Sequence, residues 1–347
     1  MIHKYPHVLW HCSIAAESEG AKEKDGMSTE TFHHKLDFSG LSLEKAGTPE
    51  WERVRAQMME VVAGEQNWFE VVYDGVAPEL REAFFGRSMK ELFALPVDVK
   101  MRNTSNKAYH GYIGQVPGFD YEALSVFDVH LADGTRSFTE LMWPEGNPSF
   151  CDTVHSFGRQ LRELEKMVRW MLLERLGVVE HFDRQNSELT FDLRLAKYGA
   201  LISQEATVAL PPHVDVSTVT LVVQHKVAGL QVLTADGEWL AVPPSPNSYT
   251  VLIGQVLQGW SNGRLRAKLH RVMVGGDETR YSAIFVSHPK DDVMVRVPEE
   301  LVDEEHPLIY KPFSYPSFVN FHHSEDGVKS DDSLKAYCGI QVDEVGP

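Results

Sequence analysis

Three separated segments of this chain carry side chains that could bind one metal ion and a carboxylate. They are His213-Val214-Asp215, His270 and Arg280-Tyr281-Ser282. Two imidazoles and one carboxylate are the ligand set of mononuclear non-haem Fe(II) sites, which leave one side of the metal open. The guanidinium of Arg280 has the planar shape that matches a carboxylate with two parallel hydrogen bonds, and Ser282 adds a hydroxyl donor. These residue types predict an oxygenase that uses Fe(II), O2 and 2-oxoglutarate.

The His-x-Asp pattern occurs twice in the sequence, so its surroundings must decide between the two copies. In a β-strand, residues i and i+2 share a face, so His213 and Asp215 could point at one metal. They open an apolar run that is typical of a strand. His181-Phe182-Asp183 instead follows a long predicted helix and leads into a polar stretch. We interpret that second copy as a helix-end feature.

The second histidine ligand must come from a distant strand, and three histidines compete for the role. His225 is followed by Lys226, a poor neighbour for a metal, and His288 precedes Pro289 beyond the end of a predicted strand. His270 starts an apolar run, and the Arg-x-Ser motif follows it. This order along the chain favours His270.

The pattern of apolar residues predicts the strands and turns that could position these side chains. After Phe191, short apolar runs alternate with turn residues, which is typical of a sandwich or jelly roll. Asp236-Gly237 and Asn262-Gly263 are predicted as hairpin turns that tolerate positive φ. The predicted strands are Leu193–Tyr198, Ser217–Val223, Leu230–Leu233, Leu240–Val242, Tyr249–Ile253, His270–Met273 and Ser282–Val286.

The first half of the chain reads as mixed and helical. We expect helices over 50–63 and 78–92, a strand over 68–72, and a long helix with an apolar stripe that ends near Gly177. The predicted organisation is a disordered leader over 1–32, a helical and mixed region over 33–180, a catalytic core over 181–300, and a segment over 301–347 that packs back on the core.

Composition narrows the function classes. The net charge of −17 repels phosphate backbones and anionic lipids, so we expect a small-molecule substrate and no nucleic-acid or membrane binding. Three widely spaced cysteines, with no Cys-x-x-Cys pair, argue against a disulfide framework or structural zinc site. With no signal peptide or membrane-length apolar run evident, we expect a cytoplasmic protein; no obligate protein partner is evident either.

Several motifs resemble the plant 2-oxoglutarate/Fe(II)-dependent dioxygenases, in particular the AOP-like branch and, more distantly, auxin-oxidising dioxygenases. They include Met142-Trp143-Pro144-Glu145-Gly146, Gly237-Glu238-Trp239, Trp260-Ser261-Asn262-Gly263 and His270-Arg271-Val272-Met273. The resemblance implies a mainly β fold with flanking helices around a double-stranded β-helix (jelly roll, cupin-like) core. It implies Fe(II) as the metal, 2-oxoglutarate and O2 as co-substrates, and ascorbate as an optional reductant.

By that resemblance, His213, Asp215 and His270 bind iron, while Arg280, Ser282 and Tyr198 bind 2-oxoglutarate. Many members of the family carry Asn-x-Tyr and Gly-Asp where this chain has Ala196-Lys197-Tyr198 and Gly254-Gln255. An apolar, mostly aromatic substrate pocket is expected beside the iron. Its candidate walls are Tyr112, Phe127, Leu221, Val223, Trp260 and Phe285.

The expected activity is hydroxylation or desaturation of a small organic molecule, a plant specialised metabolite, with release of succinate and CO2. A plant hormone (auxin-type) oxidase of the same mechanism is an alternative. Jelly rolls also serve as non-catalytic small-molecule binders, and zinc hydrolases can use the same three ligands. An intact ligand set together with Arg280 and Ser282 favours the oxygenase, because neither alternative gives the arginine a role.

Overall fold

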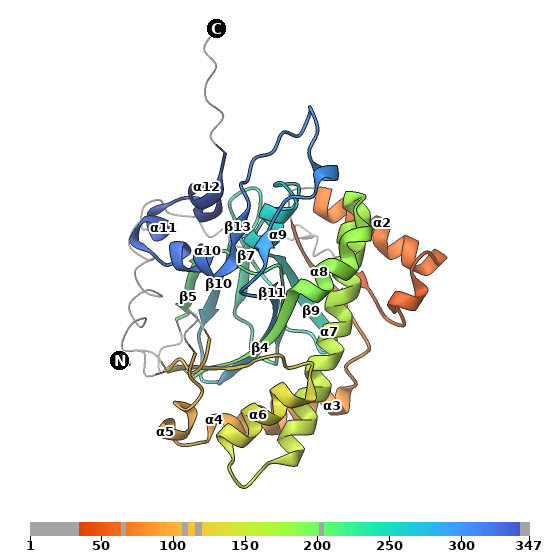
Figure 1. Ribbon diagram of the computed structural model, residues 1–347. Coiled ribbons are helices and arrows are strands. Elements are labelled where there is room, and N and C mark those ends of the chain that lie inside the picture. The colour runs from red at the N-terminus through yellow and green to blue at the C-terminus, as the bar shows by residue number, and fades with distance from the viewer. Residues whose placement is uncertain (1–34, 64–66, 106–109, 115–119, 201–204, 341–347) are drawn as a thin grey trace.

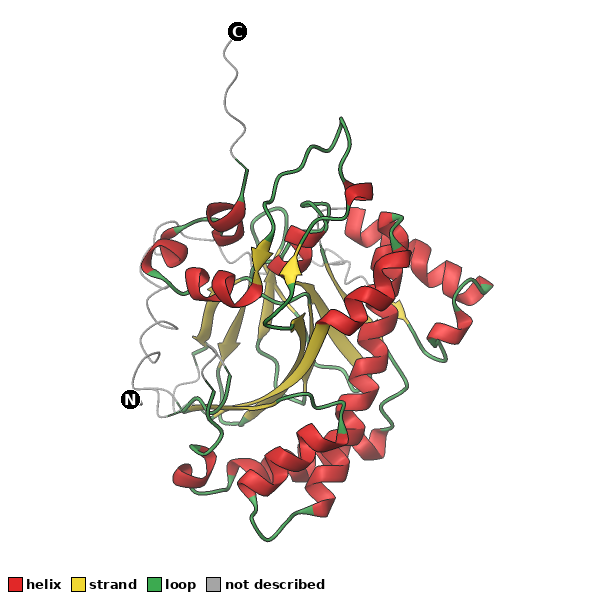
Figure 2. Ribbon diagram, in the orientation of Figure 1, coloured by secondary structure: helices red, strands yellow, loops and turns green. Residues whose placement is uncertain are grey.

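The computed structural model describes residues 35–63, 67–105, 110–114, 120–200 and 205–340. The predicted leader therefore lies outside the described residues. Two β-sheets face each other at the centre of the molecule, and helices surround them on the outside (Figures 1 and 2).

The larger sheet has seven strands in the order β1-β2-β9-β6-β11-β4-β3. Only β1 and β2 pair in parallel; the other neighbours are antiparallel. In that spatial order the strands are Lys35–Asp37, Trp68–Val72, Ser248–Ile253, Val219–Gln224, Arg280–Pro289, Leu189–Tyr198 and Tyr121–Val126.

The smaller sheet has four strands in the order β5-β10-β7-β8, which are Thr207–His213, His270–Val274, Leu230–Leu233 and Trp239–Ala241. Along the chain from β4 to β11, the strands move back and forth between the two sheets, as in a double-stranded β-helix. The predicted fold class is therefore confirmed.

Helix α7, Pro148–Leu176, runs along the outer face of the larger sheet (Figure 1). Asn147 caps its start by accepting a 3.0 Å hydrogen bond from the Phe150 amide, and Pro148 occupies the first turn. Gly177 ends it with φ of 73°, a conformation that glycine adopts without strain. Its apolar stripe shares one buried cluster with residues of the central strands, so α7 fixes which face of the sheet is core.

The other helices cover the sides and one end of the barrel (Figure 2). The predicted helix over 78–92 forms as α3 (Pro78–Glu82), a π-helical stretch η2 (Ala83–Ser88) and α4 (Met89–Phe93). The remaining α-helices before the last strands are α2 (Pro49–Ala63), α5 (Val97–Lys100), α6 (Ala132–Met142), α8 (Phe182–Glu188) and α9 (Gln255–Trp260). The short 3-10 helices are η1 (Leu43–Lys45), η3 (Val179–His181) and η4 (Glu299–Leu301).

The C-terminal segment closes one end of the barrel. It contains the short strand pair β12 (Met294–Val295) and β13 (Phe313–Ser314), then α10 (Tyr315–His322), α11 (Glu325–Lys329) and α12 (Ser333–Cys338). None of the helices in the described part of the chain is both long and apolar enough to span a bilayer. Because β1 to β3 join the larger sheet from before residue 181, that sheet extends past the predicted core boundary, and the domain limits stay a prediction.

One of the two predicted hairpin turns is wrong. Asp236-Gly237 does connect the paired strands β7 and β8, with φ of 81° at Gly237. Asn262-Gly263 instead follows helix α9, where Asn262 has φ of 54° and Gly263 of 76°. The Asn-Gly pair needs positive φ in either setting, so the dipeptide alone does not distinguish a hairpin from a helix end.

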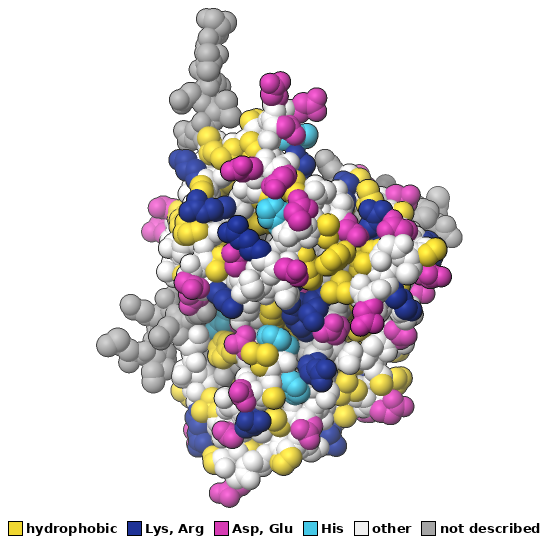
Figure 3. Space-filling model, turned by 45° about the vertical axis from the view of Figure 1, so that its right-hand side comes forward, with side chains coloured by type: hydrophobic (Ala, Val, Ile, Leu, Met, Phe, Trp, Pro, Cys, Tyr) yellow, Lys and Arg dark blue, Asp and Glu magenta, His cyan; other side chains and the backbone are white. Residues whose placement is uncertain are grey.

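On the face shown in Figure 3, acidic and basic side chains are interspersed. Acidic groups gather at the tip of the loop over 302–309, which contains Asp303, Glu304 and Glu305. On this face the acidic groups therefore lie beside lysines and arginines.

Candidate active site

The three predicted metal ligands meet at one end of the smaller sheet. His213 is the last residue of β5 and His270 the first of β10, and the antiparallel pairing sets the two residues opposite each other. Their ring centroids lie 4.2 Å apart. Asp215 Oδ1 lies 3.7 Å from His213 Nε2 and 3.8 Å from His270 Nε2. These separations are longer than hydrogen bonds and suit three groups that share one ion.

His213 and Asp215 do not share one strand, although the sequence predicts that they do. Asp215 does not continue the strand of His213 but lies in the turn between β5 and β6. The turn holds it in place, because the Gln255 amide donates a 2.8 Å hydrogen bond to the Asp215 carbonyl. The two side chains therefore converge through a turn, and not through the shared face of one strand.

Backbone contacts fix both imidazoles in the orientation that metal binding requires. His213 Nδ1 donates to the Pro211 carbonyl at 2.9 Å, and His270 Nδ1 donates to the Lys268 carbonyl at 3.0 Å. A neutral ring that donates from Nδ1 keeps its lone pair on Nε2, the atom that faces Asp215 in both cases. Burial and the neighbouring His270 lower the pKa of His213 to about 4, so this ring is a neutral ligand at pH 7.

Asp215 supplies the negative charge. Burial by itself would raise the pKa of its carboxyl group, but His270 and His213 hold it below the usual range. Its Oδ2 is buried and has no hydrogen-bond partner among the described residues. A buried carboxylate oxygen without a donor is costly unless a cation or proton compensates it. This donor set therefore fits a divalent metal ion.

The other two histidine candidates lie outside the cluster of His213, Asp215 and His270. His225 stacks on Phe85 with ring centroids 4.8 Å apart, on the helical side of the larger sheet. His288 lies inside strand β11, not beyond it as predicted, and its Nε2 is 2.9 Å from Asp192 Oδ2. His270 is the histidine that completes the first cluster.

Arg280 starts β11 and is buried in the same cavity. Its Nη1 donates to Ser282 Oγ at 3.2 Å and its Nη2 to Gln224 Oε1 at 2.9 Å, while Nε has no acceptor. Among the described residues, no carboxylate lies within ion-pair distance of its guanidinium. A buried cation that lacks an acidic partner fits an anionic co-substrate.

Two neighbours shape the space around this cation. The Arg280 guanidinium carbon lies 4.9 Å from the centre of the Tyr198 ring, and burial raises the pKa of that tyrosine, so its hydroxyl stays protonated. A Cβ added to Gly229 would lie 2.6 Å from Arg280 Nε and 2.6 Å from the Met273 carbonyl. Because glycine has no side chain, position 229 leaves enough space for the Arg280 guanidinium.

The two departures from the family pattern have separate environments. Ala196 packs in an apolar cluster with Tyr198, and so contributes no polar contact there. The Gln255 side chain accepts a 3.1 Å hydrogen bond from the Ser333 hydroxyl, whose oxygen lies 2.7 Å from His322 Nδ1. Gln255 therefore ties the turn that carries Asp215 to helix α12, whose Ser333 in turn contacts α10.

The predicted substrate wall is largely wrong. Leu221, Val223 and Phe285 belong to the cluster on the α7 side of the larger sheet, so they face away from the cavity. Trp260 lines a separate cavity with His181. The cavity beside the metal cluster is instead lined by alternate residues of the same strands, among them Val222, Ile284 and Val286.

The other two predicted wall residues lie behind the cavity surface. Tyr112 donates a 2.7 Å hydrogen bond to Glu122 Oε1 and packs near Lys100. Phe127 stacks on His110, which does line the cavity, with ring centroids 5.7 Å apart. Neither of the two is part of the cavity lining in the described structure.

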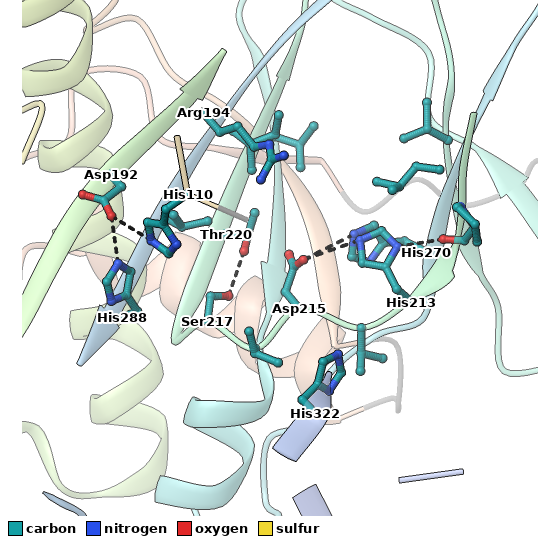
Figure 4. A pocket seen from close by; sticks show the side chains of 18 of the residues that line it. His110, Asp192, Arg194, His213, Asp215, Ser217, Thr220, His270, His288 and His322 are labelled. Carbon is teal, nitrogen blue, oxygen red and sulfur yellow. Dashed lines mark hydrogen bonds and ion pairs between the residues drawn. The ribbon is translucent and has the colours of Figure 1, made fainter. Parts of the chain in front are cut away.

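The sequence analysis missed a second cluster in the same cavity, formed by His110, Asp192 and His288 (Figure 4). It also missed His322, which points into the cavity from α10 below Asp215 in Figure 4. One signal was available, because Asp192 is an acid between the apolar residues Phe191 and Leu193 of β4. Burial lowers the pKa of His322 to about 4, so this ring is neutral at pH 7.

Comparisons with known proteins agree with this geometry. Residues 190–289 match the model of the 2OG-Fe(II) oxygenase superfamily. The chain is 37% identical over 311 residues to the probable 2-oxoglutarate-dependent dioxygenase AOP1.2 of Arabidopsis thaliana, covering 88% of this chain and 95% of that relative.

Solved structures show the same fold. A rice dioxygenase for auxin oxidation superposes with a TM-score of 0.73 at 28% identity, covering 88% of this chain and 99% of that one. JOX2 in complex with 2OG, Fe and JA superposes with a TM-score of 0.71 at 25% identity, covering 88% of this chain and 89% of that one. The predicted resemblance, enzyme class and cofactors are thereby confirmed: this chain belongs to the 2-oxoglutarate- and Fe(II)-dependent oxygenases.

Proposed function

We propose that this dioxygenase hydroxylates or desaturates a small organic molecule of plant specialised metabolism, with release of succinate and CO2. The observation that carries the proposal is the convergence of His213, Asp215 and His270 in one cavity with Arg280, a buried cation that lacks a carboxylate partner among the described residues. The likeness to AOP1.2 of Arabidopsis thaliana supports the choice of substrate class.

Each polar residue has a task in this proposal. His213, Asp215 and His270 would hold Fe(II), and Arg280 with Ser282 would bind the distal carboxylate of 2-oxoglutarate. When bound, iron and 2-oxoglutarate supply with O2 the oxidising power that breaks a C–H bond of the substrate. The apolar side chains of Ile284 and Val286 line the cavity, where they would exclude water and hold the body of the substrate.

Oxidation of an auxin-type plant hormone by the same chemistry is the second candidate. The rice dioxygenase for auxin oxidation supports it, because the match covers 99% of that chain. We also propose a cytoplasmic location, supported by the low cysteine content, and no obligate protein partner.

Anaerobic titration with Fe(II) and 2-oxoglutarate tests the enzyme class. We expect a weak visible charge-transfer band in the wild-type protein and none in Asp215→Ala. Asp183→Ala is the matched control, because it makes the same change in the other His-x-Asp pattern, on α8, and should keep the band. An unchanged band in Asp215→Ala would overturn the assignment of the metal site.

Addition of O2 with candidate substrates then tests the reaction. Succinate formation should depend on Asp215, and the mass of the product should rise by about 16 for hydroxylation or fall by about 2 for desaturation. Acceleration of succinate formation by indole-3-acetic acid, and by none of the specialised metabolites tried, would favour the hormone oxidase.

A further inference from the structure

The second cluster, formed by His110, Asp192 and His288, has the same donor types as the predicted iron ligands and lines the same cavity (Figure 4). Strands β4 and β11 bring two of its members together. Val286 lies opposite Asp192 in their antiparallel pairing, and His288 is two residues further along the same face. His110 joins from the segment before β3. Three groups that are distant in sequence therefore converge at one place.

The separations of the donor atoms fit a shared metal ion. Asp192 Oδ2 lies 2.9 Å from His288 Nε2 and 3.3 Å from His110 Nε2. The three residues offer donor atoms that all lie within 4.8 Å of one another. Two atoms at zinc-ligand distances lie roughly 3.0–3.4 Å apart when their angle at the metal is between about 90° and 109°. The same separations allow hydrogen bonds, so the roles of the ring nitrogens must decide between the two interpretations.

The contacts of His288 require a cation on its Nε2 side. Its Nδ1 lies 3.2 Å from the Pro289 carbonyl, an oxygen that can only accept a hydrogen bond. The ionised Asp192 carboxylate, which faces Nε2, is also only an acceptor. A neutral imidazole has one N–H and satisfies one of these contacts, so a second proton or a metal ion at Nε2 is needed for both. A metal ion also accounts for His110, whose Nε2 faces the same carboxylate oxygen.

Neighbouring groups hold the donors in place. Asp192 Oδ1 accepts a 3.0 Å hydrogen bond from the Asp128 amide, so the carboxylate turns its Oδ2 toward the imidazoles. The His288 ring stacks on Tyr315 with centroids 4.9 Å apart. Both His288 and Asp192 are buried. Side chains that are already fixed lose little conformational entropy when they bind an ion, so this arrangement favours tight binding.

The donor types select the class of ion. Imidazole nitrogen is a good ligand for zinc and its transition-metal neighbours, whereas Mg²⁺ and Ca²⁺ prefer sites built from oxygen. Zn²⁺ is bound by histidine and carboxylate ligands, and it has no geometric preference of its own, so it tolerates unequal separations. With three protein ligands, zinc keeps one position for water. All three residues line the cavity, which provides the space for that position.

We propose that His110, Asp192 and His288 form a second metal site that binds Zn²⁺, separate from the iron site. The open position of the ion would face the cavity, where a water molecule fills it. This inference goes beyond the proposed function and does not depend on it, because the two sites share no ligand.

Zinc binding to the Asp215→Ala variant tests the proposal, because this variant lacks the carboxylate of the iron site and keeps the second cluster. Equilibrium dialysis followed by elemental analysis gives the number of ions bound per chain and the Kd. Co²⁺ serves as an optical substitute, since its visible bands report a four- or five-coordinate ion. We expect one Zn²⁺ per chain with a Kd below about 10 µM, and visible bands with Co²⁺.

Further substitutions in the Asp215→Ala background identify the ligands. Asp192→Asn should raise the Kd for Zn²⁺ by about 100-fold or more, because loss of a group that only orients a ligand already costs about 10- to 100-fold. His110→Phe removes one imidazole, keeps a ring that can stack on Phe127, and should have a similar effect. Glu300→Gln is the matched control. It makes the same acid-to-amide change in an exposed group that could also hold an ion, and it should leave the Kd within about twofold.

Each result supports or overturns the second site. Thermal melting shows whether the variants are folded, and His110→Phe decides if Asp192→Asn does not fold. Absence of zinc binding by Asp215→Ala, or a Kd that survives the changes at positions 110 and 192, would overturn the inference. Loss of binding in Glu300→Gln would assign the ion to the exposed group and would also overturn it. The proposed function fails separately, if the wild-type protein forms no charge-transfer band with Fe(II) and 2-oxoglutarate.

Discussion

Replacement of Arg280 by methionine tests whether this buried cation serves the co-substrate or the fold. In the structure its guanidinium makes two hydrogen bonds to neutral groups and leaves Nε without an acceptor. Burial lowers the pKa of Arg280, which reflects the cost of keeping the charged form in this cavity. A side chain held in this way is expected to contribute little to the stability of the ligand-free protein.

The expected effects on binding and stability differ in size. A carboxylate on the guanidinium gains two charge-assisted hydrogen bonds of about 1.5–3 kcal/mol each, so their loss weakens 2-oxoglutarate binding by roughly 10²- to 10⁴-fold. The free energy of unfolding should fall by less than about 1 kcal/mol or rise, because no ion pair is broken. Gln224 Oε1 also keeps its 3.0 Å hydrogen bond from the Leu230 amide.

Two measurements decide this prediction. Titration of the Fe(II)-loaded variant with 2-oxoglutarate, followed by charge-transfer absorbance, gives the Kd, and urea unfolding of the ligand-free protein gives the stability. Arg280→Lys is the control that keeps the charge but loses the planar fork, and it should weaken binding about tenfold. A Kd for Arg280→Met within about tenfold of the wild-type value, or a loss of 3 kcal/mol or more in stability, would refute the reasoning.

Three further predictions concern other parts of the site. Gly229→Ala should raise the Kd for 2-oxoglutarate by about tenfold in the same titration, because the new Cβ displaces Arg280; an unchanged Kd would contradict this. Leu221→Ala should cost about 2–5 kcal/mol in urea unfolding and leave that Kd within about twofold, since Leu221 faces α7; a large change in Kd would restore it to the cavity wall. Burial raises the pKa of Asp192, but hydrogen bonds from His110 and His288 more than offset this and hold it below the usual range. Its ionised form therefore stabilises the fold above about pH 4 and loses this effect as the pH falls further, so thermal melting should show the penalty of Asp192→Asn shrinking below that pH; a penalty independent of pH would count against it.

The sequence by itself determined the chemistry of the first cluster. Ligand type and close spacing are local properties, so His213 with Asp215 and Arg280 with Ser282 could be recognised as pairs. The predicted ligands do meet, but the prediction that His213 and Asp215 share one strand face is wrong, because Asp215 lies in a turn. Strand β5 was missed, since Pro211-Pro212 reads as a break; the strand tolerates both prolines because it is an edge strand.

Which face of each central strand meets the cavity was decided only by the tertiary structure. All six residues of β6 are buried, because α7 and its neighbours cover one side of the larger sheet and the cavity walls cover the other. Because both sides of the strand are apolar, the sequence lacks the alternation of apolar and polar residues that would show which side chains face the cavity. Leu221 was therefore placed in the cavity, although Val222 is the residue that lines it.

Contacts between distant segments also required the tertiary structure. The order of motifs along the chain favoured His270, but only the pairing of His270 with His213 in the smaller sheet brings the two rings together, and no local pattern specifies that register. The cluster of His110, Asp192 and His288 joins the segment before β3 to β4 and β11, and none of its members has a neighbour in sequence that signals its partners. Strand pairing brings such groups together because backbone hydrogen bonds and burial choose the register, and side-chain chemistry then follows from it.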